Sequence, residues 1–205
     1  MVVTRLYVVR HAATQLTEGD RFSSQPGVEL SEAGRRQATL LAERLRHVGL
    51  TAIHASPFSR AVETASLIAR PHALAIETHD GLREINHGRW DGLTREEVVA
   101  RYGEEYAAWE KDPFTLAPEG GETGASVLAR SLPVIHTIVA RHPGERVLVV
   151  SHKATIRLLI ASLLGFDPRA YRDRLDQAPA CLNILEFRDP VRARLVLLND
   201  TSHYE

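Results

Sequence analysis

The chain has 205 residues, 44% of them hydrophobic and 25% charged, which excludes a disordered or collagen-like protein. Its 25 basic and 26 acidic residues leave a net charge of −1, so no overall field recruits nucleic acid or an acidic membrane. No apolar run is long enough to span a membrane, and the lone Cys181 cannot form an internal disulfide. We therefore expect a soluble, cytoplasmic protein with no nucleic-acid or membrane partner.

The first half of the chain alternates short apolar runs with longer patterns of helical period. Three buried strands are predicted at Leu6–Val9, Thr51–Ala55 and Ala73–Glu77. Two helices are predicted at Ser31–Val48 and Pro57–Ala69. Serine suits the N-cap of the first helix, and proline suits the first turn of the second.

The second half continues the alternation. A capping box formed by Thr94 and Glu97 opens a helix to about Lys111. A loop rich in Pro and Gly then leads to a helix that ends near Arg141 and is expected to bend at Pro133. The remaining predicted elements are a strand at Val147–Val150, a helix at Ala154–Leu164, and a closing hairpin of strands at Cys181–Phe187 and Ala193–Leu198.

Unbroken apolar strands that alternate with helices predict an α/β fold, a mostly parallel central sheet covered by helices on both faces. Ligands of such sheets bind beyond the carboxyl ends of the strands. The residues that directly follow the predicted strands are therefore the first candidates for a functional site.

Polar side chains occur at several of these strand ends. Arg10 and His11 end the first strand, Arg60 lies one turn into the helix after the second, and His152 follows the fourth. Glu84 lies in the loop after the third strand. Arginine matches phosphate oxygens, neutral histidine attacks phosphorus, and a carboxyl group exchanges protons with the leaving group and water. Together they indicate phosphoryl transfer.

Each residue alone also has a purely structural interpretation. Two other Arg-His pairs, at Arg46 and Arg141, fall at predicted helix ends, where cations suit the helix dipole and face solvent. Arg60 could form a surface ion pair, Glu84 could be a solvated loop charge, and His152 could pack beside a capping serine. Their joint occurrence in this order favours the functional interpretation.

The same segments resemble the histidine phosphatase superfamily, also called the phosphoglycerate mutase-like family. Arg10–Thr14 is similar to its Arg-His-Gly-Glu/Ala-Thr/Ser signature. Further matching segments, in the family's order, are Leu30–Ala38, Ser56–Ala65, Leu82–Gly92, Pro118–Thr123 and Val149–His152. The resemblance implies a three-layer α/β/α sandwich of the phosphoglycerate mutase-like type, forming one domain over residues 1–205.

The resemblance also implies residue roles. His11 would be the phosphorylated nucleophile and Glu84 the proton donor and later the general base. The phosphoryl group would be held by Arg10, Arg60 and His152. Thr17, Ser23, Ser24 and His87 fall where relatives contact substrate, although Thr17 and the two serines depart from the family's usual residues. Ala12 replaces the usual glycine of the signature, and Lys153 replaces a glycine that often follows the second histidine.

These residues suggest a metal-independent phosphomonoesterase that needs no cofactor and acts on a small phosphorylated metabolite through a phosphohistidine. The mechanism expects His11 to be neutral and His152 preferably protonated. A cofactor-dependent phosphoglycerate mutase is the alternative within the family, but Leu82–Gly88 differs from the mutase loop. A non-catalytic phospho-ligand-binding module is the alternative from another class, although both the nucleophile and the acid are present.

A helical and loop insertion at about residues 90–124 is expected to form a lid over the site and, with residues 17–27, to set substrate selectivity. The aromatic residues in this region could line the lid, although aromatics at helical spacing more often belong to a core: Trp90, Tyr102, Tyr106, Trp109 and Phe114. The sequence does not identify the substrate or decide the oligomeric state, and a homodimer is compatible with it.

Overall fold

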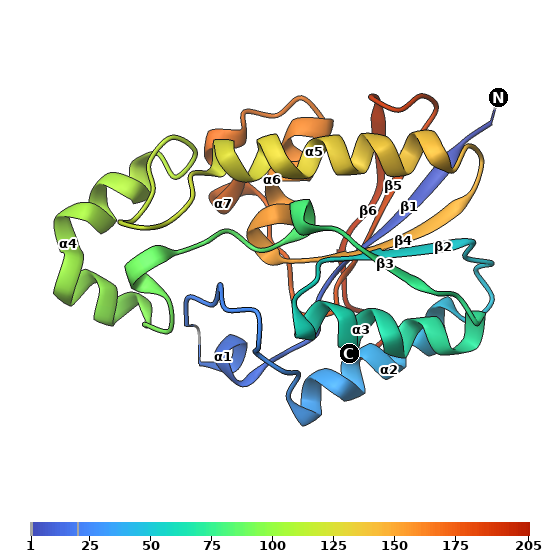
Figure 1. The fold of residues 1–205 in the computed structure, drawn as a ribbon, viewed down its shortest axis with the longest axis horizontal. Coiled ribbons are helices and arrows are strands. Elements are labelled where there is room, and N and C mark those ends of the chain that lie inside the picture. The colour runs from blue at the N-terminus through green and yellow to red at the C-terminus, as the bar shows by residue number, and fades with distance from the viewer. Residues whose placement is uncertain (1, 20) are drawn as a thin grey trace.

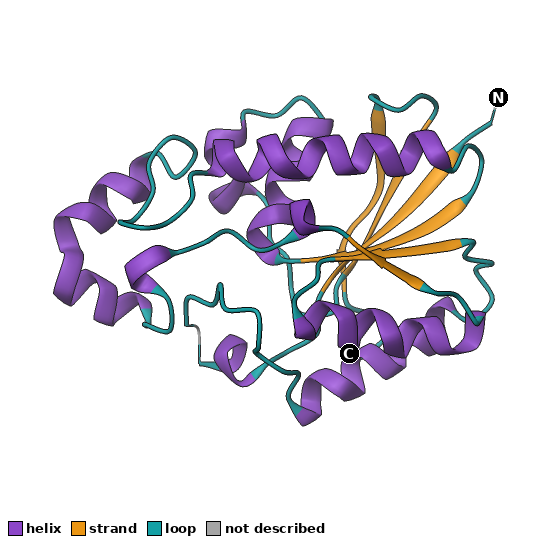
Figure 2. Ribbon diagram, viewed as in Figure 1, coloured by secondary structure: helices purple, strands orange, loops and turns teal. Residues whose placement is uncertain are grey.

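A six-stranded sheet lies between two layers of helices in the computed structural model, which describes residues 2–19 and 21–205 (Figures 1 and 2). The strand order is β3-β2-β4-β1-β5-β6, and the first three of these five pairings are parallel. The pairings of β5 with β1 and β6 are antiparallel. The predicted three-layer architecture with a mostly parallel sheet is therefore confirmed.

The strands match the predicted apolar runs closely. Their bounds are β1 Thr4–Arg10, β2 Ala52–Ala55, β3 Ile76–Thr78, β4 Arg146–Ser151, β5 Leu182–Phe187 and β6 Ala193–Asp200. The main helices are α2 Glu32–Leu45, α3 Ser59–Ala69, α4 Arg95–Lys111, α5 Gly124–Arg141 and α6 Lys153–Leu163. Two single-turn helices, α1 Gln15–Glu18 and α7 Tyr171–Arg174, have too few residues to show helical periodicity in the sequence.

Each central strand buries side chains on both faces. In β1, Leu6 and Val8 join the cluster under α5 and α6, whereas Tyr7 and Val9 join the cluster under α2 and α3. This alternation follows from the two-residue period of a strand. All four side chains are at most 5% exposed, and burying each one stabilises the fold by roughly 1.5–3 kcal/mol. Two-sided burial explains the unbroken apolar runs.

The third strand differs most from its prediction, since it begins at Ile76 rather than Ala73. A short 3₁₀ helix, Arg70–His72, continues after α3 and is followed by Ala73 in the left-handed region, with φ of 54°. The chain therefore turns through Ala73 before it becomes extended.

The helix bend also falls in a different place from the prediction. Helix α5 runs unbroken through Pro133 (Figure 1). The irregular backbone lies instead in α4 at Tyr102, where φ is −137° and ψ is 37°. The capping box of α4 forms as predicted, with Thr94 and Glu97 each bonding to the other's backbone N–H.

Gly34 allows helix α2 to pack tightly against the segment that leaves β1. A Cβ atom at this position would lie 2.0 Å from the carbonyl oxygen of Ala13. The backbone N–H of Ser31 donates a 2.9 Å hydrogen bond to the same oxygen. The start of α2 therefore fixes the loop that carries His11.

Among the described residues, no helix combines the length and the apolarity needed to cross a bilayer.

Candidate active site

A cavity of about 460 Å³ opens at the carboxyl ends of β1 and β4, where the sheet geometry predicts a ligand site. Its walls come from segments that are far apart in the sequence. Six of the predicted site residues line it: Arg10, His11, Thr17, Ser23, Glu84 and His87. Arg60 and His152 complete the site from behind through their contacts with His11.

His11 is held with its Nε2 nitrogen unprotonated. Its backbone N–H bonds to the carbonyl of Ser151 at 2.9 Å, which fixes it beside β4. The ring Nδ1 lies 2.8 Å from the carbonyl oxygen of Ala12. A carbonyl can only accept a hydrogen bond, so Nδ1 carries the proton and Nε2 keeps its lone pair. The 3.3 Å contact from the Arg60 Nε–H reaches that same Nε2 atom.

The surroundings of His11 keep its ring neutral. Burial lowers its pKa well below the usual 6.5, and the nearby positive charges of Arg60 and Arg10 lower it further. A neutral imidazole is the nucleophilic form. The predicted protonation state of His11 is therefore consistent with its environment.

Two buried guanidinium groups supply positive charge beside this ring. Arg60 is 1% exposed, and its Nη1 and Nη2 atoms donate to the carbonyls of Gln25 and Ser23 at 2.7 and 3.3 Å. Arg10 donates from Nη1 to the carbonyl of Gln177 at 2.6 Å. Burial lowers the pKa of Arg60 to about 10, which still leaves the group cationic at neutral pH. The buried Nε of Arg10 has no partner among the described residues.

His152 lies beside His11, with 5.1 Å between the ring centroids. Its Nε2 is 2.7 Å from the Ser56 hydroxyl, and its buried Nδ1 has no partner in the described part of the chain. Burial, followed by the charge of Arg60, lowers the pKa of this histidine well below 6.5. The expectation of a protonated His152 is thus wrong for the free protein, because burial and the charges of two nearby arginines disfavour a third cation.

The side chain of Glu84, in the loop after β3, is held against the start of α6. Its carboxylate oxygens accept from the backbone N–H of Ala154 at 3.2 Å, of Thr155 at 3.3 Å and of Ile85 at 2.9 Å. The Nη2 of Arg130 donates to the Glu84 carbonyl at 3.0 Å. Glu84 is therefore a held group at 9% exposure, and the solvated loop charge considered as an alternative is excluded.

Of the remaining residues predicted to contact substrate, some line the cavity and one does not. Thr17 lines the cavity, and its hydroxyl bonds to that of Thr14 at 2.9 Å. Ser24 is absent from the lining, because its hydroxyl bonds to Asp91 at 2.6 Å. Burial lowers the pKa of His87 to about 4, so this residue presents a neutral ring to the cavity.

The aromatic residues near α4 form mainly a small core. Trp90, Tyr106 and Trp109 pack together at most 5% exposed, as the structural interpretation anticipates. Only Trp109 also lines the cavity. Phe114 packs instead against the core under α5. Helix α4 lies at one end of the molecule, away from the sheet (Figure 1).

Sequence reasoning missed the basic residues around the outer part of the cavity. They are Arg21, Arg95, Arg157 and Arg172. Arg157 is four residues after Lys153 on α6, so helical spacing could have placed both on one face. The other three belong to segments with no common pattern, and only the fold brings them together.

Comparison with known proteins agrees with this geometry. The family model of the histidine phosphatase superfamily (branch 1) matches residues 6–201. The chain therefore belongs to the histidine phosphatase superfamily.

Its relatives narrow the class. Phosphoserine phosphatase 1 of Hydrogenobacter thermophilus is 36% identical over 165 residues, which cover 80% of this chain and 78% of that protein. The structure of a mycobacterial glucosyl-3-phosphoglycerate phosphatase in complex with VO3 superposes with a TM-score of 0.87 at 32% identity, covering 95% of this chain and 98% of the other. A bifunctional protein of Mycobacterium tuberculosis is 36% identical over 202 residues, and the chain spans 55% of its length.

The chain is thus an enzyme, a phosphatase of the histidine phosphatase type. The hypothesis of a phosphomonoesterase is confirmed in preference to a mutase or a non-catalytic binding module.

The low pKa of His11 leads to a pH prediction. We expect kcat/KM to hold steady as the pH falls to 6.5 and to decline only below it, because His11 stays neutral there. The pH profile of kcat/KM must be corrected for the second ionisation of the substrate phosphate, at about pH 6. An acid limb with a corrected midpoint at or above 6.5 would contradict the neutral ring.

Proposed function

We propose that this phosphatase works in two steps through a phosphohistidine at His11. In the first step, Nε2 of His11 attacks phosphorus in line, the P–O ester bond breaks, and Glu84 gives its proton to the departing oxygen. In the second step, Glu84 takes a proton from water, the water oxygen attacks phosphorus, and the N–P bond breaks. The products are the alcohol and inorganic phosphate.

The observation that carries this proposal is the unprotonated Nε2 of His11 among buried arginines. The Ala12 carbonyl holds the proton on Nδ1, and the Arg60 Nε–H donates to the unprotonated Nε2 at 3.3 Å. Cations in a low-dielectric pocket stabilise the charge that develops on the phosphoryl oxygens without reorganising. Within the described residues, Nε of Arg10 and Nδ1 of His152 have no partner. The Arg10 Nε–H can donate to those oxygens, and Nδ1 of the neutral His152 can do so when Nε2 accepts from the Ser56 hydroxyl.

The substrate class follows from the charge of the outer cavity. The outer lining holds four arginines, Arg21, Arg95, Arg157 and Arg172. Asp176 pairs with Arg157 at 2.9 Å and Glu97 with Arg21 at 3.0 Å. A phosphate bound near His11 leaves Arg95 and Arg172, for which no carboxylate partner lies within the described residues, to a second acidic group of the substrate. We infer a small phosphate monoester that also carries a carboxylate, a description that fits phosphoserine and glucosyl-3-phosphoglycerate, the substrates named in its relatives.

A pair of matched substrates tests this class. We expect kcat/KM for 3-phosphoglycerate to exceed that for glycerol 3-phosphate by about 10–100-fold, because hydrogen bonds between charged groups contribute about 1.5–3 kcal/mol. Arg172 stacks on the Trp109 ring at 4.1 Å in the cavity wall. Arg172→Ala should therefore reduce the ratio of the two kcat/KM values, mainly by raising KM for 3-phosphoglycerate.

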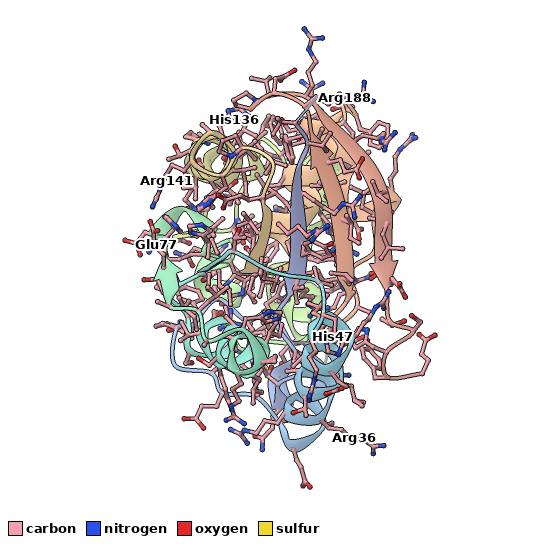
Figure 3. The ribbon with its side chains drawn as sticks, turned by 90° about the vertical axis from the view of Figure 1, so that its right-hand side faces the viewer. Arg36, His47, Glu77, His136, Arg141 and Arg188 are labelled. Carbon is pink, nitrogen blue, oxygen red and sulfur yellow. The ribbon has the colours of Figure 1, made fainter. Side chains whose placement is uncertain are left out.

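Arg188→Ala is the matched control. Arg188 is exposed and directly follows β5 (Figure 3). The end of β5 pairs with the start of β1, whereas the cavity opens at the carboxyl end of β1. This variant should keep the full preference. Equal kcat/KM for the two esters in the unmodified enzyme would reject the carboxylate class and leave the phosphatase assignment intact.

We further propose that residues 90–124 cover the substrate as a lid on a single domain. Arg95 and Trp109 support this, since both come from α4 and line the cavity. A cytoplasmic location is supported by the single cysteine, which is buried and free. The homodimer stays a prediction.

A further inference from the structure

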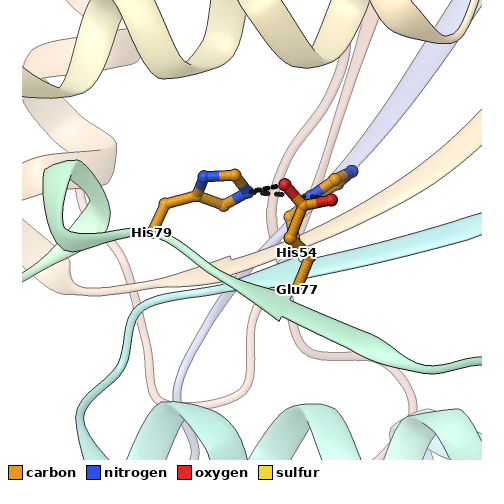
Figure 4. Close-up of side chains that lie close together, drawn as sticks. All are labelled: His54, Glu77 and His79. Carbon is orange, nitrogen blue, oxygen red and sulfur yellow. Dashed lines mark hydrogen bonds and ion pairs between the residues drawn. The ribbon is translucent and has the colours of Figure 1, made fainter.

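A second cluster of reactive side chains lies at the edge of the sheet. His54 comes from β2, Glu77 from β3, and His79 directly follows β3 (Figure 4). None of the three lines the active-site cavity. His54 is 1% exposed, whereas the side chains of His79 and Glu77 are 18% and 45% exposed. The inner end of the cluster, at His54, is thus buried, and its outer side is open for an ion to enter.

The distances within the cluster match a metal site. His54 Nδ1 lies 2.9 Å from His79 Nε2, and the Glu77 carboxylate oxygens lie 3.8 and 3.5 Å from these two atoms. Ligand atoms around tetrahedral zinc are about 3.3 Å apart, since each is roughly 2.0–2.1 Å from the ion. We propose that His54, Glu77 and His79 bind one Zn²⁺ ion, with water in the fourth position.

Further hydrogen bonds orient the buried ligand. His142 Nδ1 lies 2.8 Å from a Glu145 oxygen, which requires a proton on that nitrogen. His142 Nε2 then accepts from His54 Nε2, 3.4 Å away. With its proton on Nε2, His54 directs the lone pair of Nδ1 at the proposed ion. Ligand histidines of metal sites usually donate their second ring N–H to an acceptor that fixes the ring. Here the acceptor is His142, which is itself held by Glu145.

The ligand set favours zinc over magnesium or calcium. Two imidazole nitrogens suit zinc and neighbouring transition metals, whereas magnesium and calcium prefer oxygen ligands. Arg141 also bonds to the Glu77 carboxylate, at 2.9 and 3.1 Å, so the site carries a positive charge nearby. Only an ion with strong affinity for imidazole overcomes that charge.

The ion would tie a weak edge of the sheet to its centre. Strand β3 has three residues, none of them fully buried, and pairs only with β2 among the described strands. A bond from zinc to both strands would stabilise this edge. The site is separate from catalysis, so phosphatase activity should not depend on the ion.

The test uses the full chain, freed of metal with a chelator that is then removed. We expect calorimetric titration with ZnCl₂ to give one ion per chain, and Tm to rise by roughly 5–10 °C at zinc concentrations about 100 times Kd. Co²⁺ in place of zinc should show the intense visible bands of four-coordinate cobalt. His79→Ala and Glu77→Gln, which alter partly exposed side chains, should each weaken binding more than tenfold.

Controls separate this cluster from other histidines. His47→Ala changes an exposed ring on the α2 side of the molecule, far from Glu77 and Arg141 in Figure 3, and should bind zinc normally. His11→Ala should do so too, which excludes zinc bound in the catalytic cavity. The proposal is overturned if zinc does not bind, if His79→Ala binds as tightly as the unmodified chain, or if cobalt is six-coordinate.

Discussion

His11→Ala should lower kcat by about 10⁴-fold or more, because it removes the nucleophile and leaves only binding and charge stabilisation. The fold should survive, since the ring is held mainly by the Ala12 carbonyl and a long contact from Arg60. The measurement is steady-state hydrolysis of p-nitrophenyl phosphate, with Tm recorded for each variant.

Trapping the intermediate makes this prediction specific. Rapid quenching of the unmodified enzyme with a ³²P-labelled ester should capture an acid-labile, base-stable adduct at His11. His47→Ala should form the same adduct at the same rate, because that side chain is exposed in the turn that follows α2. Hydrolysis by His11→Ala at the normal rate, or an adduct on another residue, would disprove the proposed nucleophile.

The sequence predicted the sheet well because burial on both faces leaves an unmistakable pattern. The runs at Leu6–Val9 and Val147–Val150 are apolar without interruption, and both became central parallel strands. Strand β3 was placed less well, because its exposed residues carry no such pattern and Ala73 adopts a left-handed turn that alanine does not signal.

The inner catalytic site was predictable for a related reason. The parallel strands fix where each strand end lies, so Arg10, His11 and His152 had to meet at one edge of the sheet. The protonation state of His152 was not predictable, because it depends on burial and on the distance to Arg60. Neither the burial nor the distance can be read from the sequence alone.

Residues that lie beyond the strand ends were harder to find. Arg172 reaches the cavity from a single turn of helix, and Arg95 from the insertion. The His54, Glu77 and His79 cluster shows no metal-ligand spacing within one helix, because two paired strands bring its members together. Such groups depend on register, which a single sequence encodes only indirectly.

Glu84→Gln should affect two substrates differently. For an alkyl phosphate, kcat should fall by about 10²–10⁴-fold, because the leaving alkoxide loses its proton donor. p-Nitrophenolate leaves without protonation, so the first step with p-nitrophenyl phosphate should be nearly unchanged. Water still needs a base in the second step. The variant should therefore release one p-nitrophenolate per active site in a rapid burst and then turn over slowly.

Stopped-flow absorbance measures the burst, and Glu119→Gln is the control. Glu119 is exposed, pairs with Arg89 and does not line the cavity, so its variant should behave as the unmodified enzyme. The amide of Glu84→Gln keeps an oxygen for Thr155 N–H but turns a donor toward Ala154 N–H, so the Tm of the variant must also be recorded. Equal losses for both substrates with no burst, at an unchanged Tm, would assign the carboxylate to binding rather than proton transfer. The burst tests Glu84 in both of its roles, because its amplitude reports the first step and the slow phase reports the second.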